Sequence, residues 1–163
     1  MTEKVKTPKI SVVMQSFLGD YPGARSNPVE KFQRAVNSFL NQTYSISELV
    51  IVADECNKTW QIYDRLYRDN PKIKFAFIAK DGLSMYEEKD GQKYYRGIPR
   101  RVGVSITDGD LITYMDSDDY LMPNFLMEIA KVYNQSPTCK WWINRSWYDN
   151  VLADWPETEI MHA

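Results

Sequence analysis

Several features that define common protein classes are scarce in this chain. It has 163 residues and only two cysteines, Cys56 and Cys139, which excludes a disulfide scaffold and favours a reducing compartment. The single histidine, His162, argues against a multi-histidine metal site and against a Ser-His-Asp triad. No apolar run approaches the roughly 20 residues of a membrane span. Residues 1–9 are polar and Lys-rich, so no signal peptide is visible and we expect a cytoplasmic protein.

An excess of basic charge is also missing. Lys and Arg number 20 against 22 Asp and Glu, for a net charge of −2. Surfaces that grip nucleic acid need concentrated basic charge, so we expect no nucleic-acid partner. Neither glycine-rich phosphate loop, GxGxxG or GxxxxGK[ST], is present. A phosphate ligand would therefore have to be held differently, and a metal ion is the obvious substitute.

Short apolar runs alternate with helix-like segments along the chain. Buried strands are expected at residues 10–14, 49–53, 73–79, 111–115 and 139–143. Helices are expected between them at residues 28–40, 59–68, 99–107 and 123–134. This alternation predicts an α/β fold, with a mostly parallel sheet and helices on both faces. The length predicts a single domain over residues 1–163.

Local signals refine this interpretation. Residues 27–30, Asn-Pro-Val-Glu, predict a helix start with a capping box, and Gly109 predicts a left-handed helix end. Residues 80–95 are polar, interrupted by glycine and without a clear period, so we expect a long flexible loop that acts as a lid or contacts the acceptor. The helix over 59–68 is expected to turn four residues inward: Trp60, Tyr63, Leu66 and Tyr67.

Carboxylates collect where predicted strands end, which is where parallel sheets bind ligands. Asp54 follows the second strand, and Asp116, Asp118 and Asp119 follow the fourth within four positions. Like charges this close repel, and a divalent cation such as Mg²⁺ or Mn²⁺ would relieve the repulsion. In an extended turn, Asp116 and Asp118 would point the same way and flank one site. The alternative is an acidic turn that caps the next helix, with Asp119 near the helix N-terminus.

A series of motifs resembles those of family 2 glycosyltransferases, which have the GT-A fold. In chain order the segments are SVVMQSF (11–17), SFLNQTY (38–44), ELVIVAD (48–54), PRRVGV (99–104), GDLI (109–112) and MDSDD (115–119). The resemblance covers about residues 10–130, the nucleotide-sugar- and metal-binding core, and leaves 131–163 as a short remainder of the acceptor side. It implies metal-dependent transfer of a sugar from a nucleotide-diphosphate donor, with a UDP-sugar favoured, to an acceptor hydroxyl of a carbohydrate or other molecule. The transfer would proceed with inversion.

The resemblance also implies roles for individual residues. Asp54 would hydrogen-bond the nucleotide base, and Ser16 and Phe17 would lie in the donor site, with Phe17 against the base. Arg100 would approach the ribose or the diphosphate. In the acidic motif, Asp116, Ser117 and Asp118 would contact the ribose and the diphosphate of the donor. Asp118 and Asp119 would hold Mn²⁺ or Mg²⁺.

The chain also departs from the family pattern. Gln15 replaces the usual proline, Glu55 and Cys56 replace an Asp-Gly pair, and Arg101 stands where Asn is usual. Gln15 and Glu55 could alter the nucleotide preference. The larger departure is that only about forty residues follow Asp119.

An inverting transfer needs a base on the face opposite the leaving group. Asp154 is our candidate because the neighbouring Trp155 could stack on a sugar face. His162 is a candidate third metal ligand, although a frayed terminal residue is the simpler interpretation. Further acids in the same segment could serve as the base instead: Asp149, Glu157 and Glu159.

Two alternatives from other classes stay open. The first is a nucleotide-sugar-binding module without catalysis, either a degenerate remnant or one half of a complex whose partner subunit supplies the acceptor site; donor turnover separates it from an enzyme. A homo-oligomer also stays open. The second is a receiver-like domain that binds Mg²⁺. That class needs a lone acceptor Asp after the third strand, and here the acids follow the second and fourth strands instead.

Overall fold

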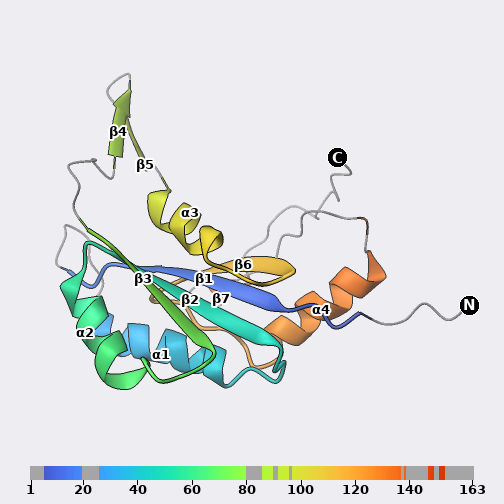
Figure 1. Ribbon diagram of the computed structural model, residues 1–163. Coiled ribbons are helices and arrows are strands. Elements are labelled where there is room, and N and C mark those ends of the chain that lie inside the picture. The colour runs from blue at the N-terminus through green and yellow to red at the C-terminus, as the bar shows by residue number, and fades with distance from the viewer. Residues whose placement is uncertain are drawn as a thin grey trace, which may run out of the picture.

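The computed structural model describes residues 6–19, 26–79, 86–89, 92–95, 97–136, 138, 147–148 and 151–152. Four parallel strands form one sheet in the order β3-β2-β1-β6 (Figure 1). Their bounds are β1 Ile10–Ser16, β2 Ser47–Asp54, β3 Ile73–Ile78 and β6 Leu111–Asp116. The helices are α1 Pro28–Leu40, α2 Asn57–Leu66, α3 Ile98–Ser105 and α4 Phe125–Gln135. Two antiparallel pairs complete the elements: β4 Tyr86–Lys89 with β5 Gln92–Tyr95, and β7 Trp147–Tyr148 with β8 Val151–Leu152.

Helices cover both faces of the sheet, as the alternating pattern predicts. Figure 1 shows α1 and α2 below the sheet and α3 above it. The lower core joins β1 and β2 to Phe32 and Phe39 of α1 and to Leu126 of α4, all at most 2% exposed. On the upper face, Val13 and Val52 pack against apolar residues of α3. Because both faces of β1 and β2 are covered, these strands read as continuous apolar runs rather than as alternating ones.

The start of α1 agrees with the sequence, but its predicted capping box does not form. The helix begins at Pro28, as expected, after Asn27. Asn27 is left-handed, with φ 57°, and its side chain makes no capping hydrogen bond. Side-chain capping requires an extended residue at this position. The main chain serves instead, with the Lys31 N–H donating to the Asn27 carbonyl at 3.1 Å.

The inward face of α2 was predicted correctly for Tyr67, which is 7% exposed, and for Tyr63, which packs against the core, but wrongly for Trp60 and Leu66. Trp60 is 43% exposed and Leu66 is 47% exposed, whereas Thr59 and Ile62 are buried. The helix starts at Asn57, and its polar Thr59 contacts β1 through the hydroxyl of Ser16, at 2.9 Å. A buried threonine with a hydrogen-bond partner thus faces the sheet where an apolar residue was expected.

Gly109 does not end a helix. The helix α3 ends at Ser105, and the positive-φ glycine of the described residues is Gly97, which precedes α3. Gly109 is needed for a close approach: its N–H donates to Ser11 Oγ at 2.9 Å, and an added Cβ would overlap that same oxygen. The glycine therefore lets the segment before β6 lie against β1.

Part of the expected loop at residues 80–95 forms a hairpin. Strands β4 and β5 pair antiparallel with Lys89 opposite Gln92, so Asp90 and Gly91 join them. Asp-Gly is a preferred dipeptide of two-residue hairpins, and this signal was overlooked. The strand expected at 139–143 lies outside the described residues. In the part of the chain that the structure describes, no helix has the length and apolarity to cross a membrane.

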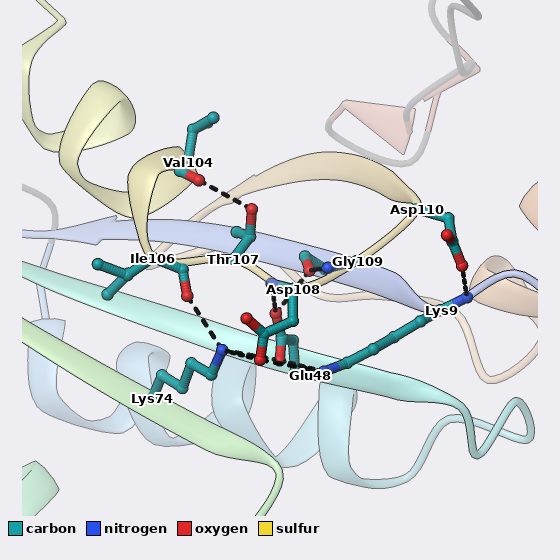
Figure 2. A network of polar contacts seen from close by, with 10 residues as sticks. Lys9, Glu48, Lys74, Val104, Ile106, Thr107, Asp108, Gly109 and Asp110 are labelled. Carbon is teal, nitrogen blue, oxygen red and sulfur yellow. Dashed lines mark hydrogen bonds and ion pairs between the residues drawn. The ribbon is translucent and has the colours of Figure 1, made fainter.

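The amino ends of the strands are tied together by a buried carboxylate, Glu48 of β2 (Figure 2). It accepts hydrogen bonds from Ser11 Oγ and the Asp108 N–H, both at 2.7 Å, and pairs with Lys9 at 2.7 Å and Lys74 at 3.3 Å. Burial disfavours its charge, but these donors outweigh burial and lower the pKa of Glu48 to about 2. The network links β1, β2, β3 and the loop before β6 at the end of the sheet opposite the acidic motif.

Candidate functional site

Three polar side chains lie on one face of the sheet at its carboxyl end. Val13 belongs to the core beneath α3, and Gln15 follows it by two residues on the same face of β1. Gln15 is paired in register with Asp116 of β6. In β2, Val52 belongs to the same core, so Asp54 also points to this face. Adjacent strands thus place Asp54, Gln15 and Asp116 side by side, under α3.

The chain bends sharply after Asp54. Asp54 is only 5% exposed. The next residue, Glu55, has φ 52°, and its N–H continues the ladder by donating to the Ile78 carbonyl at 3.1 Å. A left-handed non-glycine residue is uncommon and often marks a functional turn. The bend leads the chain out of β2 at the edge of the sheet where the acidic motif lies.

The acidic motif is a tight turn rather than the extended segment that our pairing of Asp116 with Asp118 assumed. The Asp119 N–H donates to the Asp116 carbonyl at 3.1 Å, and the Asp116 N–H donates to Asp119 Oδ2 at 3.2 Å. The i to i+3 bond is that of a β-turn. Asp119 does not cap α4, which begins six residues later at Phe125. Among the described residues, no three acidic, histidine or cysteine side chains are grouped to hold a metal ion.

Arg100 covers Asp116 from the first turn of α3. Its Nη2 lies 3.3 Å from Asp116 Oδ1, and its guanidinium lies 5.5 Å from the ring centroid of Tyr114. Both charged side chains are about half exposed, at 48% and 54%. An ion pair this exposed contributes little to stability. The guanidinium is therefore held at the carboxyl edge and remains accessible to another anion.

The remaining predicted residues are distributed unevenly. Phe17 is exposed at 39% beside this edge, and Ser117 and Asp118 are half-buried in the acidic turn. Ser16 is 1% exposed, and its hydroxyl faces α2 on the opposite side of the sheet from Asp54 and Asp116. The candidate base and its alternatives, together with the candidate third metal ligand, lie outside the described residues: Asp154, Asp149, Glu157, Glu159 and His162.

Two residues at the site were missed as site residues. Gln15 was noted as a departure from the family motif that could alter the nucleotide preference, but it was not placed in the site; its buried Oε1 has no hydrogen-bond partner among the described residues. Strand alternation from Val13 could have placed it. Arg34 of α1 donates through Nη2 to the Asp118 carbonyl at 2.6 Å. No sequence signal shows this contact, because it joins residues 84 positions apart.

Comparison with known proteins gives glycosyltransferases as relatives. No known family's sequence profile matches the chain. An uncharacterized glycosyltransferase of Nostoc sp. is 28% identical over 130 residues, which are 78% of this chain and 34% of that protein. The poly(ribitol-phosphate) beta-N-acetylglucosaminyltransferase TarP of Staphylococcus aureus is 24% identical over 74% of this chain and 32% of its own. Chondroitin synthase of Pasteurella multocida is 28% identical over 80% of this chain and 13% of its own.

Solved structures confirm the predicted GT-A fold. S. aureus TarS 1–349 superimposes with a TM-score of 0.60 and 22% identity, covering 80% of this chain and 34% of TarS 1–349. Its complex with UDP-GlcNAc gives a TM-score of 0.59 at 20% identity, covering 86% and 38%. The predicted resemblance is thus confirmed: the chain contains a domain that resembles glycosyltransferases in sequence and in fold. The chain spans about a third of the length of the first two relatives.

Proposed function

We propose that this chain is the donor-binding part of a metal-dependent glycosyltransferase. It binds a UDP-sugar across the carboxyl ends of β2, β1 and β6 and supports transfer of the sugar to an acceptor hydroxyl with inversion. The single observation that carries the proposal is that Asp54, Gln15 and Asp116 share one face at these strand ends, beside Arg100. Its similarity to glycosyltransferases and the TarS complex with UDP-GlcNAc support the donor class.

The two ends of the site suit the two ends of a nucleoside diphosphate. Asp54 is nearly buried, so its carboxylate can accept a hydrogen bond from the N–H of uracil in surroundings from which water is largely excluded. Phe17 is exposed nearby and offers a ring for contact with the base. Arg100 offers a planar cation that can exchange Asp116 for a phosphate oxygen. Base recognition thus falls to β2 and diphosphate recognition to the edge between α3 and β6.

The acidic turn fits a metal that takes part of its coordination from the donor. Mg²⁺ commonly uses one or two carboxylates, waters and substrate phosphates. Asp118 and Asp119 would provide carboxylate oxygens of that kind, and the described residues offer no cluster of three metal-binding side chains that would hold a metal alone. When bound, the metal would act as a Lewis acid that stabilises the departing nucleoside diphosphate. We therefore expect metal and nucleotide to bind together.

Inversion needs a base opposite the leaving group, and we keep Asp154 in that role as a proposal. The structure describes the strands β4 and β5 of the predicted lid, which pair antiparallel. Closing such an element over the donor would exclude water from it.

The test of base recognition is calorimetric titration of the full chain with UDP and GDP in the presence of Mn²⁺. We expect UDP to bind at least about tenfold more tightly than GDP, and Asp54→Asn to weaken UDP binding by about tenfold or more, since a charge-assisted hydrogen bond contributes about 1.5–3 kcal/mol. The matched control is Asp69→Asn, an exposed carboxylate beyond α2. Equal affinity for both nucleotides, or an unchanged Asp54→Asn variant, would contradict the assignment.

A second candidate, a nucleotide-sugar-binding module without catalysis, would use the same donor site at Asp54, Gln15 and Asp116. Release of sugar or its transfer from UDP-GlcNAc separates the two. Turnover that exceeds the spontaneous rate supports the enzyme, and UDP-GlcNAc binding without turnover supports the module.

A further inference from the structure

A stripe of three polar side chains runs along one face of α1 and just beyond it. The stripe consists of Arg34, Ser38 and Gln42, which are spaced four residues apart and therefore lie on one side of a helix. Ser38 is buried at 4% exposure, Gln42 is half-buried and Arg34 is exposed. The stripe faces the segment that connects β6 to α4 and that contains the acidic turn.

Each member of the stripe bonds this segment, and the contacts follow the order of the chain. Arg34 Nη2 donates to the Asp118 carbonyl at 2.6 Å, and Ser38 Oγ accepts from the Leu121 N–H at 3.0 Å. Gln42 donates to the Met122 carbonyl at 2.8 Å and accepts from the Leu126 N–H at 3.0 Å. The stripe therefore holds the segment at several points between the acidic turn and the start of α4.

All of these contacts end on main-chain atoms, three in the segment and one in the first turn of α4. Residues 117–124 lie outside helix and strand, so no regular ladder fixes their path. Bonds to the main chain fix that path independently of the segment's own side chains. None of these bonds uses a carboxylate of the acidic turn. Thr43, which follows Gln42, adds a further bond to the segment: its N–H donates to the Pro123 carbonyl at 3.0 Å.

We infer that Arg34, Ser38 and Gln42 are positioning residues, which set where the acidic turn stands relative to Asp54 and Arg100. This inference rests on the proposed function, in which the turn holds the metal and the diphosphate. Arg34 acts nearest the carboxylates. It bonds Asp118, and its exposed position means that its removal leaves the core of α1 unchanged. Ser38 and Gln42 hold the rest of the segment.

The test uses the full chain in four forms: wild type, Arg34→Ala, Arg34→Lys and the control Asn37→Ala, an exposed residue on the same helix. UDP binding is measured by calorimetry with and without Mn²⁺, and bound Mn²⁺ by electron paramagnetic resonance. Amide hydrogen exchange of Asp119 and Leu121 is measured in the metal-free protein.

For Arg34→Ala we expect the gain in UDP affinity on adding Mn²⁺ to fall about tenfold, while affinity without Mn²⁺ stays within about twofold. The Asp119 and Leu121 amides should exchange faster, with β1 and β2 unchanged. Arg34→Lys should recover part of the gain, and Asn37→Ala should match wild type. Arg34→Ala that matches Asn37→Ala in both readouts, or that speeds exchange throughout the sheet, overturns the inference. A wild type without Mn²⁺-dependent UDP binding contradicts the proposed function instead, and the exchange data then decide whether the stripe positions the turn.

Discussion

Two carboxylates at opposite ends of the sheet, Glu48 and Asp116, differ in burial and in their hydrogen-bond partners. Glu48 is buried at the amino ends of the strands and is surrounded by donors from three other segments. Asp116, at the carboxyl end of β6, is half exposed and pairs with the half-exposed Arg100. A fully partnered buried carboxylate stabilises the fold, whereas an exposed one can exchange partners. The network around Glu48 and the proposed ligand site therefore lie at opposite ends of the sheet.

Glu48→Gln should lower the free energy of unfolding at pH 7 by roughly 3–4 kcal/mol, because a pKa lowered from 4.5 to about 2 corresponds to that differential interaction. The folded pKa is depressed, so the stabilisation is complete above about pH 4.5 and is lost as the pH falls toward 2. Urea unfolding from pH 7 to pH 2.5 should show the difference between variant and wild type shrinking below pH 4.5. The control is Glu128→Gln, an exposed carboxylate that pairs with Lys131 on α4. A difference that stays constant over this range would contradict the pKa assignment.

At the scale of elements, the strands of the sheet could be predicted from the sequence. The faces to which individual side chains point were harder to predict. Continuous β-branched runs such as residues 49–53 identify doubly covered strands, and the structure extends this one only to Ser47–Asp54. Periodicity fails where polar residues take inward positions, as Thr59 does in α2. It also fails for the hairpin of β4 and β5, whose strands lack apolar alternation.

The candidate site was predictable as a location but not as a geometry. Motif order placed Asp54, Arg100 and Asp116 at one edge, and the structure brings them to that edge. A turn at residues 116–119 was kept as an alternative from the sequence, but the two hydrogen bonds within it were not predicted. The bond from Arg34 to Asp118 joins residues 84 positions apart, so it has no local sequence signal.

The packing of α3 on the sheet depends on a glycine. Gly103 faces β1, and a Cβ there would overlap Val13 Cγ1 and lie 3.2 Å from Val52 Cγ2. Gly103→Ala should therefore destabilise the protein by about 1–3 kcal/mol, although alanine favours a helix by about 1 kcal/mol. Thermal or urea unfolding measures the effect, with Ser105→Ala, at an exposed position of the same helix, as control. A Gly103→Ala protein more stable than wild type would show that α3 is not closely packed here.

For the molecule as a whole, the two ends of the sheet differ. Hydrogen bonds and ion pairs join the strands at the amino end, and the carboxyl end is accessible. The Glu48 network ties the amino ends together, while Asp54, Gln15, Asp116 and Arg100 gather at the carboxyl ends. Beside them, Ile112 and Tyr114 of β6 are 41% and 48% exposed on the face that carries α3. The matched region covers 34% of S. aureus TarS 1–349. In the proposed function the described residues bind the donor, and the acceptor site stays a prediction.

The proposal that the acidic turn binds the metal and the diphosphate is tested most directly by calorimetric titration of UDP into the full chain, with and without Mn²⁺. The titration compares wild type with a variant that combines Asp118→Asn and Asp119→Asn. We expect Mn²⁺ to raise the affinity of wild type for UDP by about tenfold or more, because Asp118 and Asp119 would hold the metal and the metal would stabilise the charge of the diphosphate. The double variant should lose this gain while unfolding at the same temperature as wild type. UDP binding that ignores Mn²⁺, or a gain that survives in the double variant, would contradict the claim that the acidic turn is the metal and diphosphate site.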